Sequence, residues 1–131
     1  MESHVAPVIG NVDVALLNHH GNRDSQNEFF ISSLQPRVWI SQSWTIRHPG
    51  EDVLRCIMSP YVYPGERDLF TNSLHPVNEQ YLGESLSKAF KSKNGHIAIR
   101  VYPGGNKYDI FILNDLSTTR NVVAKYGYQS R

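Results

Sequence analysis

Short apolar runs and polar loops alternate along the first fifty residues of the chain. Residues 12–17 are an aliphatic run with no charge after Asp13, which predicts a largely buried strand, and a polar loop follows at residues 18–22. Residues 38–43 predict a second strand, which ends in a polar and aromatic loop. A helical pattern over residues 25–34 lies between the two strands. This order predicts a parallel crossover unit whose strands are adjacent.

The predicted crossover helix has a start and a stop signal. Asp24 is placed to cap the helix, and Phe30 and Leu34 lie four residues apart on one face. Pro36 prevents the helix from continuing, so we expect about ten helical residues.

The clearest helical pattern follows the second loop. Pro49 suits a first helical position, and Glu51 and Asp52 complement the helix dipole. An apolar stripe follows on one face, formed by Val53, Leu54, Ile57 and Met58. Beyond it, the prolines between residues 59 and 78 predict an irregular segment with one short strand at 68–72.

The last third of the chain predicts one more helix and a hairpin. The amphipathic positions of that helix are Leu82, Leu86, Ala89 and Phe90. Alternating runs at 96–102 and 108–113 flank a loop with two glycines, which predicts an antiparallel hairpin. Residues 115–131 have weak periodicity and form either an edge strand or a loosely ordered tail.

Composition narrows the classes of protein. A chain of 131 residues that is 40% hydrophobic can build one modest core, so we expect a single unit over residues 1–131. A net charge of +1 disfavours a nucleic acid or a membrane surface as partner. We expect a soluble protein, without a membrane span or a targeting signal in this sequence. The single cysteine, Cys56, lies in an apolar helical pattern and predicts a buried, unreactive thiol.

Histidines follow both predicted strands. His19 and His20 lie in the first loop and His48 lies at the end of the second. Because loops beyond the carboxyl ends of parallel strands form a common crevice, the three imidazoles are expected to converge there. Imidazole binds zinc and other first-row metals. Adjacent side chains of an extended segment point to opposite sides, so one of His19 and His20 would bind metal and the other would orient the site.

Simpler explanations exist for the same residues. A His-His-Gly turn at 19–21 can merely satisfy backbone groups at a strand end, and His48 can be a neighbour of a helix cap. Asp13 and Asp24 are candidate carboxylates behind the ligands, although capping also explains Asp24. The remaining histidines are interpreted as structural or solvated, namely His4, His75 and His96.

These residues form an ordered series that resembles the metallo-β-lactamase-fold hydrolases related to the competence DNA-uptake protein. The series comprises His-His-Gly at 19–21, a helix, Pro-Arg at 36–37 and His-Pro at 48–49. It covers residues 12–58, and the later hairpin fits the general plan. Arg47 replaces the glycine of the family's Gly-His-Pro, and Asn22 replaces a frequent serine. The principal ligand motif of the family, His-x-His-x-Asp-His, does not occur before Val12.

The resemblance implies an α/β fold that forms roughly the C-terminal half of an αββα sandwich. It also implies a site for one or two ions of zinc or another divalent first-row metal, which activates water to hydrolyse a small-molecule or ester-type substrate. In that site His19 and His20 supply a metal ligand and its neighbour, and His20 and His48 line the catalytic pocket. This chain would then be a C-terminal fragment of a hydrolase, with little or no metal affinity of its own.

Two other functions are kept open. The chain can be a non-catalytic α/β binding or interaction module, in which case a partner or self-association should cover the sheet face that the missing half exposes. An enzyme that uses Cys56 as nucleophile is the third hypothesis, and the apolar setting of that thiol argues against it.

Overall fold

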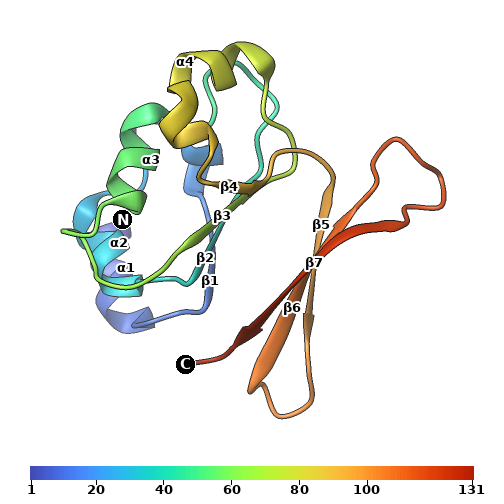
Figure 1. The fold of residues 1–131 in the computed structure, drawn as a ribbon. Coiled ribbons are helices and arrows are strands. Elements are labelled where there is room, and N and C mark those ends of the chain that lie inside the picture. The colour runs from blue at the N-terminus through green and yellow to red at the C-terminus, as the bar shows by residue number, and fades with distance from the viewer.

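A parallel sheet and an antiparallel sheet stack face to face in the computed structural model, which describes all of residues 1–131 (Figure 1). The parallel sheet has the order β1-β2-β3-β4, with bounds β1 (Val14–Leu16), β2 (Val38–Ser41), β3 (Asp68–Thr71) and β4 (Phe90–Ser92). The antiparallel sheet has the order β5-β6-β7, with bounds β5 (His96–Val101), β6 (Lys107–Leu113) and β7 (Val122–Gln129).

Helices cover the other face of the parallel sheet. Their bounds are α1 (Glu2–Ile9), α2 (Glu28–Leu34), α3 (Glu51–Met58) and α4 (Pro76–Ser87), and a short 3-10 turn, η1 (Asn18–Gly21), follows β1. The chain therefore has three layers, helices, parallel sheet and antiparallel sheet (Figure 1). This confirms the predicted α/β class. None of the four helices has the length and apolar character that crossing a membrane requires.

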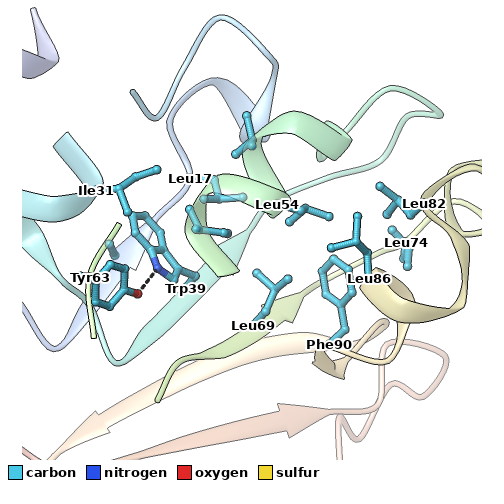
Figure 2. Packing of buried hydrophobic residues seen from close by; sticks show 13 residues of the cluster. Leu17, Ile31, Trp39, Leu54, Tyr63, Leu69, Leu74, Leu82, Leu86 and Phe90 are labelled. Carbon is cyan, nitrogen blue, oxygen red and sulfur yellow. Dashed lines mark hydrogen bonds between the residues drawn. The ribbon is translucent and has the colours of Figure 1, made fainter. Parts of the chain in front are cut away.

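Two apolar interfaces join the layers. The larger one packs the helices on the parallel sheet around Trp39, Leu54 and Leu69, all fully buried (Figure 2). The smaller one joins the two sheets, with Ile40 of β2 and Phe70 of β3 against β6. Because the parallel sheet is covered on both faces, all four residues of β2 are buried instead of alternating.

The predicted crossover unit is confirmed. β1 pairs with β2 in parallel, with Val14 opposite Val38, and α2 connects the two strands. The predicted hairpin is also confirmed, since β5 and β6 pair antiparallel. Residues 122–129 form β7, an edge strand on β6, and Tyr128 Oη donates a 2.6 Å hydrogen bond to Asp68 of β3.

Two predicted helix starts were wrong, and the last helix begins inside the segment that was expected to be irregular. α2 begins at Glu28 because Asn27, and not Asp24, accepts the hydrogen bond from Phe30 N–H at 3.0 Å. α3 begins at Glu51, after Pro49, because Gly50 is held outside the helix by its hydrogen bond to Gly21 O at 2.8 Å. α4 begins at Pro76, where the His75 ring caps the helix by accepting from Val77 N–H.

Two elements were missed by sequence reasoning. Phe90 is four residues from Leu86, as in a helix, yet it begins β4 because it pairs with Leu69 at the sheet edge. The second is α1, which buries Ala6 against α2, while Glu2 accepts hydrogen bonds from Asn27. Pro7 inside α1 and exposed apolar residues such as Val8 conceal its amphipathic pattern in the sequence.

Candidate functional site

The loops after β1 and β2 bring three histidines together. The ring centroids of His20 and His48 are 5.5 Å apart, those of His19 and His48 are 6.2 Å apart, and those of His19 and His20 are 6.3 Å apart. The cluster lies beyond the carboxyl ends of two adjacent parallel strands, as the sequence predicted. We call His19, His20 and His48 the histidine cluster.

The expectation that His19 and His20 point to opposite sides was wrong. It assumed an extended segment, but both residues adopt left-handed backbone angles, with φ of 47° and 59°, inside the turn η1. This turn places both rings on the side of His48. Side-chain alternation holds for strands, and the strand ends at Leu16.

Gly21 keeps the two histidine loops in contact. Its φ is +79°, and a Cβ at this position would lie 2.8 Å from Leu17 Cδ1 and 2.8 Å from Pro49 Cβ. Its carbonyl accepts the hydrogen bond from Gly50 N–H. Gly21 is therefore required both for the turn and for the close approach of the second loop.

Hydrogen bonds orient two of the three rings. His20 Nδ1 lies 2.7 Å from the carbonyl oxygen of Gln42, which can only accept, so Nδ1 carries the proton and Nε2 of the neutral ring has a free lone pair. His19 Nδ1 lies 3.1 Å from a carboxylate oxygen of Asp24, which also only accepts, so in the neutral His19 ring the proton again lies on Nδ1 and Nε2 is free. A bond of this kind at one ring nitrogen is typical of histidines that bind metal through the other.

Asp24 therefore stands behind His19, in the role that the sequence left open between a supporting carboxylate and a helix cap. Asp13 does not belong to the site, because its carboxylate accepts hydrogen bonds from Ser130 and Arg131 at the other end of β1. His4 and His96 are exposed and lie outside the cluster, and His75 caps α4.

Sequence reasoning missed two residues that support the cluster. Trp44 lies with its ring centroid 4.1 Å from that of His20, edge to face. Asn78, which is buried, donates from Nδ2 to the carbonyl oxygens of His48 and Pro49 at 2.9 Å and 3.1 Å. The aromatic residue in a polar loop was a visible signal for Trp44, whereas nothing in the sequence connects Asn78 to a loop thirty residues earlier.

The His48 ring is partly buried. Its Nδ1 is buried without a hydrogen-bond partner. Burial lowers the pKa of His48, and the neighbouring His20, His19 and Arg47 lower it further, against a small opposite effect of Asp24. His48 is therefore held in the neutral form that a metal ligand needs.

The pKa of His48 predicts a loss of stability in acid. Because its pKa is lower in the folded than in the unfolded protein, the unfolded protein binds more protons, so stability should fall as the pH drops below about 6.5 and through the folded pKa. NMR titration of the imidazole protons in metal-free protein measures the pKa of folded His48, on which this prediction depends. Arg47→Ala should raise the pKa of His48, and Arg120→Ala serves as the exposed control. An unchanged His48 titration in Arg47→Ala would contradict the electrostatic account.

The cluster is not a closed metal shell. Imidazole ligands of one tetrahedral zinc ion have ring centres on the order of 5 Å apart, somewhat closer than here. No group of three or more histidine, cysteine, aspartate or glutamate side chains is arranged to hold a metal ion. The donor chemistry suits zinc, and the free Nε2 atoms of His19 and His20 are suitable ligands, but the rings must move together to share an ion.

Cys56 lies in α3 and is partly buried. Burial, with a contribution from Glu28, raises the pKa of its thiol. The raised pKa agrees with the unreactive thiol expected from the sequence.

Comparison with known proteins adds no relative: no family model, no curated protein and no solved structure matches this chain.

Proposed function

We propose that the histidine cluster contributes ligands to a divalent metal site, zinc by preference, in a hydrolase that activates water. One observation carries the proposal: three imidazoles from two loops converge at the carboxyl edge of a parallel sheet, and two of them have Nδ1 engaged so that Nε2 is free. A fully structural cluster has no need of three adjacent rings that repel one another when protonated.

Each side chain has a distinct role in this proposal. His19 and His20 would hold the ion through Nε2, with Asp24 and Gln42 fixing their tautomers. His48, kept neutral by burial, would complete the cluster or accept a proton from the attacking water. A bound zinc ion supplies a water molecule whose pKa is lowered to about 7.

The proposal treats this chain as one part of the site. In the hydrolases that the sequence resembles, further ligands come from the His-x-His-x-Asp-His motif. The remaining ligands would thus be supplied by a longer polypeptide or a partner, and the substrate would be a small molecule with an ester-type bond.

Zinc binding is the direct test. Isothermal titration of the 131-residue protein near pH 7.5 should show only weak binding, because part of the ligand set is missing, and His20→Ala should weaken it further by at least about tenfold, since a ligand is lost. His96→Ala is the matched control, because His96 is exposed and lies outside the cluster. Lowering the pH should weaken binding in both the parent protein and the control as the imidazoles become protonated. Equal affinity of His20→Ala and His96→Ala would contradict the proposal.

Hydrolysis distinguishes the enzyme from a binding module. With the remaining ligands present, cleavage of a chromogenic ester should require zinc and should be abolished by replacing both His19 and His20 with alanine. Zinc binding without zinc-dependent cleavage would instead favour the non-catalytic module, and cleavage that survives the double replacement would exclude the assigned site.

A further inference from the structure

A hollow of about 440 Å³ adjoins the histidine cluster. Its wall is built from the residues that flank the cluster in sequence, including Asn22 after Gly21, and Arg47 and Gly50 on either side of His48 and Pro49. The first turns of α4 close the other side. This volume lies within the range of about 300–1,000 Å³ that small-molecule sites occupy.

The hollow has cationic groups without partners. Arg23 and Arg47 both line it. Neither guanidinium takes part in an ion pair or a hydrogen bond; in both residues only the backbone N–H donates, to the side chains of Asn22 and Thr45. The acidic residue in the wall, Glu51, is already engaged by Arg55, with N···O distances of 2.7 Å and 2.8 Å. The unneutralised charge facing the hollow is therefore positive, and guanidinium groups bind carboxylates in a bidentate geometry.

Apolar side chains line the rest of the hollow. Ile46, Val77 and Tyr81 are 52%, 54% and 66% exposed, although each is large and hydrophobic. Three such side chains around one hollow, next to two free guanidinium groups, complement a ligand that has an apolar body and an anionic end.

We propose that this hollow binds a small amphipathic carboxylate, with its anionic group on Arg47 and Arg23 and its aliphatic or aromatic body against Ile46, Val77 and Tyr81. This inference rests on the proposed function and specifies its substrate class: the carboxylate is held in the hollow while the bond to be cleaved lies at the histidine cluster. Arg47 stands where the resembling hydrolases have glycine, so this anchor is a feature of the present chain.

The test uses metal-free protein and a matched pair of probes. Hippurate carries a carboxylate and a benzoyl group, and hippuramide differs only by a neutral amide. Titration followed by ¹H–¹⁵N NMR should give saturable shifts at Val77, Tyr81 and Arg47 with hippurate, and an affinity roughly tenfold lower with hippuramide, because a charge-assisted hydrogen bond is lost.

Variants locate the anionic contact. Arg47→Gln should weaken hippurate binding roughly tenfold, Arg47→Lys less, and Arg120→Gln, an exposed arginine elsewhere, not at all. Circular dichroism confirms that each variant is folded, and Arg23→Gln provides a second variant if Arg47→Gln is unfolded. No saturable shift, equal affinity for the two probes, or shifts confined to other residues would overturn the proposal.

The hippurate and zinc titrations together separate the carboxylate proposal from the proposed metal function. Hippurate binding is read without metal, so a protein that binds hippurate but no zinc would retain the carboxylate site and lose the metal function. A protein that binds zinc through the histidine cluster but shows no preference for hippurate would retain the metal function and lose this substrate class.

Discussion

Trp39→Ala should lower the free energy of unfolding by about 3–5 kcal/mol. Trp39 is fully buried at the centre of β2, where it contacts the helical layer. Its Nε1 donates a 2.9 Å hydrogen bond to Tyr63 Oη (Figure 2). Tyr63 Oη in turn donates to Pro36 O. Removing the indole leaves a cavity and deprives Tyr63 of a donor. A domain of this size is stable by about 5–15 kcal/mol, so much of its stability would be lost.

Trp44→Ala is the matched control for this replacement. Trp44 is 61% exposed, so its loss should cost less than about 1 kcal/mol. Urea denaturation followed by far-ultraviolet circular dichroism gives both values without relying on tryptophan fluorescence. Trp39→Phe, which retains much of the packing and removes the hydrogen bond, should be intermediate. If Trp39→Ala costs no more than Trp44→Ala, the helices do not cover this face of the parallel sheet.

Gly21→Ala should destabilise the protein by about 2–5 kcal/mol and displace the histidine loops. A Cβ at this position meets Leu17 Cδ1 and Pro49 Cβ at 2.8 Å. The end of the leucine side chain can rotate away, but the proline ring is rigid, so Pro49 must move and His48 with it. The overpacking costs about 1–3 kcal/mol, in addition to about 1–2 kcal/mol for a left-handed backbone.

Gly105→Ala separates these two costs. Gly105 has nearly the same backbone angle, with φ of +74° against +79°, and nothing lies within 4 Å of the added Cβ. The difference in unfolding free energy between the two variants therefore measures the contact of the two loops. The imidazole resonances of His48 should shift in Gly21→Ala and remain unchanged in Gly105→Ala. Equal destabilisation by both variants, with no shift at His48, would show that the loops tolerate separation.

The sequence predicted those parts of the fold that depend on neighbouring residues. The aliphatic run before the His-His-Gly turn, the helix between two strands and the late hairpin were all recognisable, because periodicity reflects which face of an element is buried. The convergence of His48 with His19 and His20 followed from topology alone, since the loops after adjacent parallel strands lie at the same sheet edge.

Tertiary structure decided everything that depends on contacts between distant segments. Helix starts were displaced because distant segments hold the residue before each helix, as Gly21 O does for Gly50 N–H and Glu2 does for Asn27, the N-cap of α2. Phe90 has helical spacing from Leu86, yet its pairing with Leu69 of β3 makes it a strand residue.

The orientation of the histidines shows the same division. The sequence by itself determined that His19, His20 and His48 share one edge of the sheet. Only the tertiary structure decided that both rings of the pair face His48, because the left-handed turn at His19 and His20 is held by the bonds of their rings to Asp24 and Gln42. It also decided that Arg23 and Arg47 border one hollow with Tyr81. Local sequence cannot encode such proximity, because it arises from packing between segments that lie more than twenty residues apart.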